Sequence, residues 1–257
     1  MLDFGYYNMD CLDGMKLIDD KSVDMILTDL PYGTTQCAWD VIIPFEPLWE
    51  QYNRIIKDNG AILLFGSEPF SSYLRLSNID MYKYDWIWKK THPKGHLNAK
   101  KQPMRSHEII SVFYKNHPTY NPQMTHGHDR KVARSDYIKE SNGDSCYGRE
   151  VRKTNYDSTD RYPLDVQTFS NGNQRGKIHP TQKPVSICKY MIMTYTNKSD
   201  LVLDSCAGSC TTGVACYETG RNFIGFEKNK EIYRKGMERY KVETAQMNLF
   251  DFPEVLP

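Results

Sequence analysis

The chain contains a tetrad suited to binding a flat heterocycle that carries an amino group. Asp29, Leu30, Pro31 and Tyr32 directly follow an apolar run. A carboxylate and a backbone carbonyl can accept both hydrogens of an –NH2 group, which orients the nitrogen lone pair toward an electrophilic methyl group. The ring of Tyr32 can stack on a base extruded from a nucleic-acid helix. Taken alone, such a string is usually an ordinary proline turn with an Asp cap.

A second constellation, residues 204–213, is rich in small side chains and lies between an apolar run and a helical pattern. Small side chains let the backbone approach a ligand, and the N-terminus of a helix presents free N–H groups. Glu227 ends the next apolar run, 23 positions after Asp204, where a carboxylate can accept hydrogen bonds from ribose hydroxyls. These features predict a nucleotide-type cofactor loop, with a ligand-free turn as the alternative.

A third constellation, residues 179–184, reads His-Pro-Thr-Gln-Lys-Pro and precedes another helical pattern. Its two prolines fix the backbone, and Thr181 and Lys183 have side chains that can reach a carboxylate or phosphate. The alternative is a plain helix start with proline in the first turn.

The hydrophobic pattern indicates which elements position these residues. Short apolar runs predict strands and a 3.6-residue period predicts helices. We expect strands at 23–28, 61–65, 84–88, 108–114, 201–203 and 223–226, and helices at 45–57, 185–195, 211–218 and 230–240. Each of the first two constellations therefore follows a strand. This order predicts a doubly wound α/β fold with a mostly parallel sheet and a ligand at the carboxyl ends of the strands.

The middle of the chain differs from the rest in charge and pattern. Residues 89–177 hold 17 Lys+Arg against 9 Asp+Glu, whereas the remainder holds 16 against 23. A basic middle on an acidic frame predicts a polyanionic partner, with a solvated variable insertion as the alternative. Periodicity fails over 116–176, which we interpret as a loop-rich insertion or lobe.

Several classes of protein are not indicated. The seven cysteines show no C-x-x-C pair, and the histidines at 92, 96, 126 and 128 lack cysteine partners, so we expect neither disulfides nor a metal. No run approaches the roughly 20 apolar residues of a membrane helix, and we expect a soluble, cytoplasmic protein.

Together, in this order, the three constellations resemble the β class of amino-methylating DNA methyltransferases. That class has a D-P-P-Y tetrad, a target-recognition region, an H-P-T-Q-K-P segment and an A-G-S-G-T-T-G loop. The continuation D-L-P-Y-G-T-T with Trp39-Asp40 resembles a subgroup common in bacteriophages. The resemblance implies one methyltransferase domain over 1–257, a recognition insertion at about 89–177, a tail at 244–257, and a bacterial or phage-infected host, with or without a restriction enzyme.

The resemblance also assigns roles to individual residues. Asp29 would bind the target amino group, Leu30 would contribute its carbonyl, and Tyr32 would stack on the flipped base. Residues expected to bind S-adenosylmethionine are Asp10 near its adenine, Glu227 on its ribose, Thr181 and Lys183 near its methionine end, and Asp204, Ala207, Gly208, Ser209, Thr211 and Thr212 of the loop. Candidates for contacts to double-stranded DNA are Lys94, Lys100, Lys101, Arg105, Arg130, Lys131, Arg134, Arg149, Arg152, Lys153 and Arg175.

The resemblance leaves alternatives open. A leading Asp favours adenine N6, with cytosine N4 as the nearest alternative; RNA or protein-glutamine methylation normally goes with Asn at position 29. Ser205 and Cys206 replace the usual Pro-Phe, and Cys210 replaces a glycine. If residue 210 needs φ > 0, its Cβ costs about 1–2 kcal/mol, which weakens cofactor binding on the order of tenfold. A DNA-binding protein with impaired catalysis is therefore the alternative from another class.

The sequence and the resemblance indicate two further partners, the bacterial sliding clamp and a second copy of the chain. Gln246-Met247-Asn248-Leu249-Phe250 resembles the Q-x-x-L-F peptide that docks on the bacterial sliding clamp, and as a tail after the last helix it could present Leu249 and Phe250 to an apolar pocket. The alternative is that these residues pack back on the domain. Because members of the resembled class are often dimers, a homodimer is left open.

Overall fold

Helices and strands alternate along most of the chain, as the hydrophobic pattern predicts. The computed structural model describes residues 2–34, 40–135, 154–172 and 182–250. The chain divides into two compact units, residues 1–121 with 165–257 and residues 122–164. The smaller unit holds the antiparallel pair β6 (Lys131–Ser135) and β7 (Thr154–Ser158).

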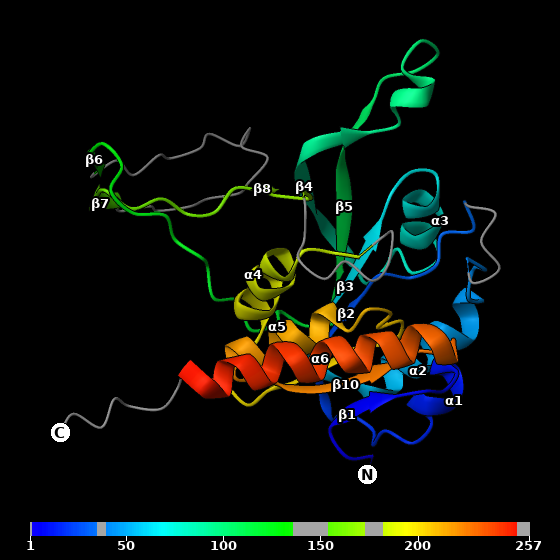
Figure 1. Ribbon diagram of the computed structural model, residues 1–257. Coiled ribbons are helices and arrows are strands. Elements are labelled where there is room, and N and C mark those ends of the chain that lie inside the picture. Colours follow the sequence, from blue (N-terminus) through cyan, green and yellow to red (C-terminus); the bar gives the residue numbers. More distant parts are fainter. Residues whose placement is uncertain (1, 35–39, 136–153, 173–181, 251–257) are drawn as a thin grey trace. The chain divides into compact units, whose positions relative to one another are not determined.

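The larger unit is built on an eight-stranded sheet, as far as the described residues go (Figure 1). In spatial order its strands are β1 (Gly5–Tyr7), β10 (Asn222–Phe226), β9 (Leu201–Asp204), β2 (Val23–Thr28), β3 (Ile56–Gly66), β5 (Arg105–Phe113), β4 (Tyr82–Lys94) and β8 (Val166–Phe169). The first five run parallel. β5 is antiparallel to both β3 and β4, so its first residues lie at the edge where the parallel strands end. The expected doubly wound, mostly parallel fold is confirmed.

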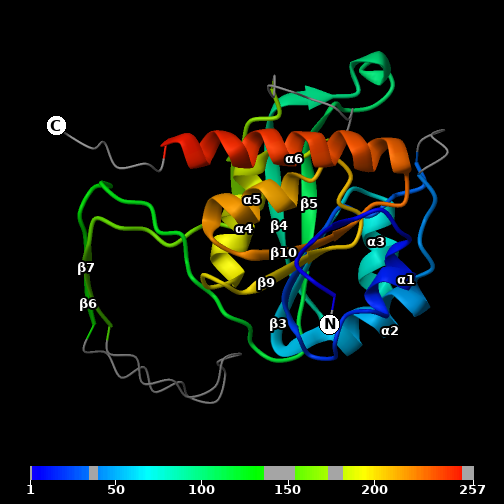
Figure 2. The ribbon, with the colours of Figure 1, turned by 60° about the horizontal axis from the view of Figure 1, so that its bottom comes forward.

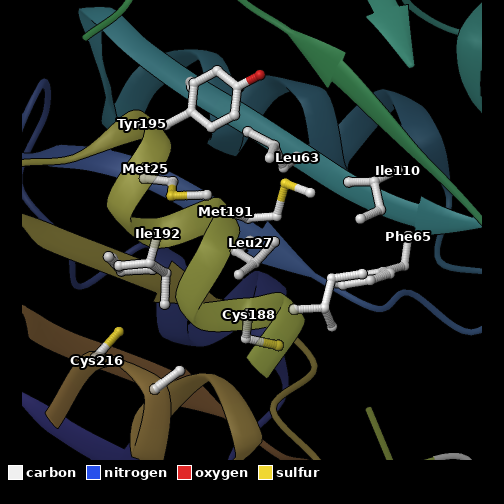
Figure 3. Close-up of a cluster of buried hydrophobic side chains, with 14 of the residues drawn as sticks. Met25, Leu27, Leu63, Phe65, Ile110, Cys188, Met191, Ile192, Tyr195 and Cys216 are labelled. Atoms are coloured by element: carbon white, nitrogen blue, oxygen red, sulfur yellow. The ribbon is translucent and has the colours of Figure 1, made fainter. Parts of the chain in front are cut away.

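Helices cover both faces of this sheet because its central strands are apolar on both sides. Alternate residues of β2 belong to different core clusters: Met25 and Leu27 pack with α4 (Val185–Tyr195) and α5 (Thr211–Thr219), as Figure 3 shows for α4. Ile26 packs on the other face. That face is covered by α1 (Cys11–Met15), α2 (Phe45–Ile55) and α3 (Phe70–Leu76). Figure 2 shows the two helix groups apart, with α6 (Lys230–Phe250) beside α5.

Some predicted elements differ from the observed ones. The helix expected over 45–57 ends at Ile55, because Ile56 is extended and begins β3. β6, β7 and β8 lie in the segment interpreted as loop; β8 is an edge strand with no buried residue, so it has no apolar alternation to detect. The last helix continues to Phe250. The expectation that 246–250 follow the last helix, in a tail from 244, is therefore wrong.

Among the residues that the structure describes, no helix is both long and apolar enough to span a membrane. Within the same residues, no group of His, Cys, Asp and Glu side chains is arranged to hold a metal ion.

Candidate functional site

A cavity of about 1070 Å³ lies at the carboxyl ends of the parallel strands. Asp29 enters it directly after β2, Ser205 directly after β9, and Glu227 directly after β10. The tetrad and the small-residue loop therefore open into one space, although they are far apart in the sequence. Such a crevice is where doubly wound sheets bind their ligands.

The tetrad places a carboxylate beside an aromatic ring. The Tyr32 hydroxyl donates to Asp29 Oδ1 at 2.6 Å, and the ring of Tyr32 stacks on Phe70 with centroids 4.9 Å apart and planes 24° from parallel. Burial, and next the charge of Asp29, raise the pKa of Tyr32 well above its usual value, so the hydroxyl stays a donor. Leu30 and Pro31 also line the cavity. The four predicted tetrad residues are brought together at one wall.

A buried carboxylate fixes the turn that follows the tetrad. Asp40 accepts hydrogen bonds from the N–H groups of Gly33 and Thr34, both at 2.9 Å. Gly33 has φ +65°, a left-handed backbone that glycine adopts without cost. The sequence identified Asp40 only as part of a subgroup motif. The structure shows that its carboxylate stabilises the turn through these two hydrogen bonds. Its neighbour Trp39 lies outside the described residues.

Lys183 joins the tetrad to a chain of alternating charges. Its Nζ lies 2.5 Å from Asp29 Oδ2 and 3.3 Å from Glu108 Oε2, and Lys90 Nζ lies 2.5 Å from Glu108 Oε1. Burial opposes the charge of Lys183, but Asp29 and Glu108 outweigh it and raise its pKa. Burial likewise opposes ionisation of Glu108, but Lys183 and Lys90 outweigh it and lower its pKa. Lys183 and Glu108 are therefore both ionised near neutral pH.

The sequence interpretation missed Lys90 and Glu108 as site residues. Glu108 was assigned only to a strand, and Lys90 lies beyond the strand predicted over 84–88 but within β4, which continues to Lys94. A signal did exist: an antiparallel strand places its first residues at the carboxyl edge of the parallel strands, so a charged residue there faces the ligand site. That signal requires the strand direction, which the sequence pattern does not supply.

The cofactor loop surrounds two carboxylates with neutral donors. Asp204 Oδ2 accepts from the Thr212 hydroxyl at 2.6 Å and Oδ1 from the Cys206 N–H at 3.1 Å, and burial raises the pKa of Asp204 to about 7. Glu227 accepts from the N–H groups of Gly208 (3.2 Å) and Asn229 (2.7 Å). Burial raises the pKa of Glu227 too, partly offset by these two bonds.

The other predicted cofactor residues fall into three groups. Asp10 caps α1 by accepting from the Leu12 N–H and pairs with Lys228 at 3.0 Å; these contacts outweigh burial and lower its pKa. Thr181 lies outside the described residues, and Lys183 contacts the tetrad as described above. The remaining loop residues predicted to bind cofactor also line the cavity: Ala207, Gly208, Ser209, Thr211 and Thr212.

The structure shows the surroundings of Cys210 and Ser205, two of the residues at which the loop departs from the usual pattern. Cys210 has φ +57°, as expected for a position where glycine is usual, and its side chain is fully buried with Sγ against Gly213. Cys210 is not among the described residues that line the cavity, so its thiol does not obstruct a ligand. The Ser205 N–H donates to the Thr28 hydroxyl at 3.0 Å, a bond that proline could not make.

The predicted DNA contacts are distributed over both units. In the larger unit, Lys94, Lys100, Lys101 and Arg105 are exposed on the hairpin between β4 and β5. In the smaller unit, Lys131 is exposed and Arg130 makes two bonds to Asp157, at 2.7 and 2.6 Å. The side chain of Arg134 is not described, and the remaining candidates lie outside the described residues: Arg149, Arg152, Lys153 and Arg175. Only residues 122–164 separate as a unit, whereas the expected insertion spans about 89–177.

Comparison with known proteins gives consistent matches. A family model described as DNA methylase matches residues 23–238. Type II methyltransferase M.HpaI of Haemophilus parainfluenzae is 29% identical over 93% of this chain and 74% of its own length. DNA adenine methyltransferase YhdJ of Escherichia coli is 28% identical over 91% of this chain and 81% of its own. A crystal structure of an M1.HpyAVI–SAM complex has the same fold, with a TM-score of 0.61, 23% identity, and coverage of 93% of this chain and 98% of its own.

Proposed function

The chain belongs to the DNA methylase family, and we propose that it transfers a methyl group from S-adenosylmethionine to N6 of adenine in double-stranded DNA. The observation that carries this proposal is the shared cavity, which is lined both by Asp29 of the tetrad, here called the transfer half, and by Asp204 and Glu227, here called the cofactor half. A methyl donor and a target base placed in these two halves would meet inside the protein.

The charge of the cofactor half fits S-adenosylmethionine. Asp204 is buried and Glu227 is half-buried, the pKa values of both are raised, and no described Lys or Arg lies within ion-pair distance of either. A cationic ligand that carries hydroxyl groups would supply the missing charge and donors. In the proposed binding mode, Glu227 binds the ribose of the cofactor and Asp10 lies near its adenine ring. When bound, the cofactor supplies a methyl carbon attached to positively charged sulfur.

The transfer half fits an exocyclic amino group. Asp29 accepts one amino hydrogen and the Leu30 carbonyl the other, which aims the nitrogen lone pair at the methyl carbon. Transfer would form a carbon–nitrogen bond and break the carbon–sulfur bond, leaving a neutral thioether, and the positive charge that develops on the nitrogen would be lost as one proton to water. The Asp29 carboxylate stabilises this charge, and Lys183 holds the carboxylate in place. Tyr32 receives the base extruded from the helix.

Adenine is preferred as the target for two reasons. Asp leads the tetrad, and YhdJ is named a DNA adenine methyltransferase. Cytosine N4 is the second candidate, because the family model is named for both N6 and N4 methyltransferases. A bacteriophage or bacterial origin, action in the cytoplasm, a homodimer and sliding-clamp docking through 246–250 remain predictions.

Transfer of labelled methyl from S-adenosylmethionine to unmethylated bacterial DNA, followed by nucleoside digestion and mass spectrometry, tests the proposal. We expect label in N6-methyladenine. Label in N4-methylcytosine would establish the second candidate. Cofactor binding without transfer to any DNA would contradict both.

A further inference from the structure

The hairpin between β4 and β5 extends into solvent beyond what the sheet requires. Residues 91–107 are all exposed, and the two strands stay paired as far as Lys94 and Arg105 (Figure 1). A two-stranded ribbon that buries neither face gains little stability from burial. Its base is nevertheless held firmly: the Asn171 amide accepts from the His92 N–H at 2.9 Å and donates to the His92 carbonyl at 2.8 Å.

This ribbon, defined as residues 89–107, carries only positive formal charge. Residues 89–107 include six Lys or Arg and no Asp or Glu. Within the described part of the chain, the one ion pair formed by these six is Lys90 with Glu108. The other cations are available to phosphates, and a two-stranded ribbon is narrow enough to enter the major groove of DNA.

The tip of the ribbon is apolar. Leu97, in the 3-10 turn η1 (His96–Asn98), is 88% exposed, a larger fraction than any other large hydrophobic side chain described. A single exposed leucine is ordinary on a protein surface. Leu97, however, lies at the end of a cationic ribbon, and lysines that bind phosphates would place its side chain against the stacked bases.

The ribbon also begins at the cavity that Asp29 lines. Lys90 and Lys94 line the cavity, and Leu97 follows three residues later. Three residues span at most about 10 Å, roughly three base steps of 3.4 Å. The tip therefore lies no more than about 10 Å of backbone beyond Lys94, a residue of the cavity that Asp29 also lines.

We propose that this ribbon inserts into DNA beside the target base. The Leu97 side chain then wedges between base steps and fills the gap that the extruded base leaves in the stack. The inference rests on the proposed function. An apolar wedge compensates part of the unstacking cost, as it does in proteins that kink DNA. Leu97 is thus a positioning residue for base extrusion.

The test compares Leu97→Ala with Leu76→Ala, a matched control because Leu76 is 71% exposed and lies on α3. The substrates are two duplexes that carry the methylated sequence, mapped from a plasmid modified in cells expressing the protein. In one duplex the target base is paired, and in the other it lies opposite a mismatch, which lowers the cost of extrusion.

We expect Leu97→Ala to transfer methyl about tenfold more slowly than the wild type to the paired duplex and at near wild-type rate to the mismatched one, with Leu76→Ala unchanged on both. An equal loss on both duplexes, or no loss on either, would overturn the wedge. If the wild type methylates neither duplex, the proposed function itself has failed.

The cationic part of the ribbon has a separate test. In the double variant Lys100→Ala/Lys101→Ala, the slope of log binding constant against log salt should fall by about two for any duplex. An unchanged slope would show that the ribbon does not bind phosphates.

Discussion

The two halves of the cavity handle buried charge in opposite ways. In the transfer half, the carboxylates of Asp29 and Glu108 both contact Lys183, and Lys90 completes the chain. In the cofactor half, Asp204 and Glu227 accept only from hydroxyl or backbone N–H groups among the described residues. In the transfer half each carboxylate is paired with a lysine, whereas the cofactor half carries unpaired negative charge that burial disfavours.

This difference indicates what each half contributes. A compensated site is pre-organised, because its carboxylate is held before the base arrives. An uncompensated site stores a penalty that a cationic ligand relieves on binding. Changes in the transfer half should therefore affect turnover, and changes in the cofactor half should affect affinity.

The largest effect is expected from Asp29→Ala. Without the carboxylate, the amino group loses its acceptor and its developing charge is unsupported, so the transfer rate at saturating cofactor should fall by about 1000-fold or more. Calorimetric titration should give a dissociation constant for S-adenosylmethionine near the wild-type value. Because Asp29→Ala also removes a partner of Lys183, Asp29→Asn is the matched variant, with folding checked by thermal melting. Near wild-type turnover in both would refute the proposed role.

The converse split is expected for Glu227→Gln. The amide can still accept from Gly208 but offers no charge to the ribose hydroxyls, so cofactor affinity should drop about tenfold. The transfer rate at saturating cofactor should stay within about twofold of wild type. A lower rate with unchanged affinity would mean that Glu227 belongs to the transfer half.

Glu108→Gln tests the charge chain. The variant removes one of the two carboxylates that raise the pKa of Lys183, so the Lys183 pKa should fall. If transfer requires charged Lys183, the transfer rate of the variant should begin to fall at a lower pH than that of the wild type. At alkaline pH the variant should be about tenfold slower than the wild type. Glu50→Gln, an exposed position on α2, is the control. A pH profile identical to wild type would show that Glu108 does not act through Lys183.

The pH dependence of folding tests the uncompensated half. The pKa of Asp204 is about 7 in the fold against 3.8 ordinarily, so the folded state binds the extra proton. Its stabilising contribution is full below about pH 4 and lost as the pH rises through about 7. Asp204→Asn should match the wild type in melting temperature at pH 4 and exceed it at pH 8. The opposite order would mean that Asp204 is compensated in solution.

The smallest effect is expected from Cys210→Gly. Glycine relieves the left-handed backbone, worth about 1 kcal/mol, but loses a buried side chain of similar value. Because Sγ lies against Gly213 and not in the cavity, the cofactor dissociation constant should change less than twofold. A tenfold gain in affinity would restore the hypothesis that Cys210 impairs the loop.

Much of the fold could be predicted because its core elements bury contiguous apolar residues. The helix at 185–195 and the strands at 23–28 and 201–203 were recognisable from local pattern alone, and the structure confirms them. β6, β7 and β8 escaped, because a solvent-facing strand such as β8 takes its stability from pairing with a neighbour distant in sequence.

The same contrast applies to the site. Asp29 to Tyr32 and Asp204 to Thr212 form local strings that the sequence displays directly. Lys90 and Glu108 come from antiparallel neighbours that meet only when the sheet forms. The left-handed backbone of Cys210 was predictable from its place in a glycine pattern, but the direction of its thiol was not.

The separation of the two halves can be measured directly in one experiment. The protein is loaded with labelled S-adenosylmethionine, the bound amount is determined, DNA is added, and the label transferred per bound cofactor is counted in the first turnover. Wild type and Glu227→Gln should both transfer nearly all bound label, although Glu227→Gln binds less. Asp29→Asn should bind as the wild type does and transfer almost none. Efficient transfer by Asp29→Asn, or failure of Glu227→Gln to transfer what it binds, would contradict the division of the cavity.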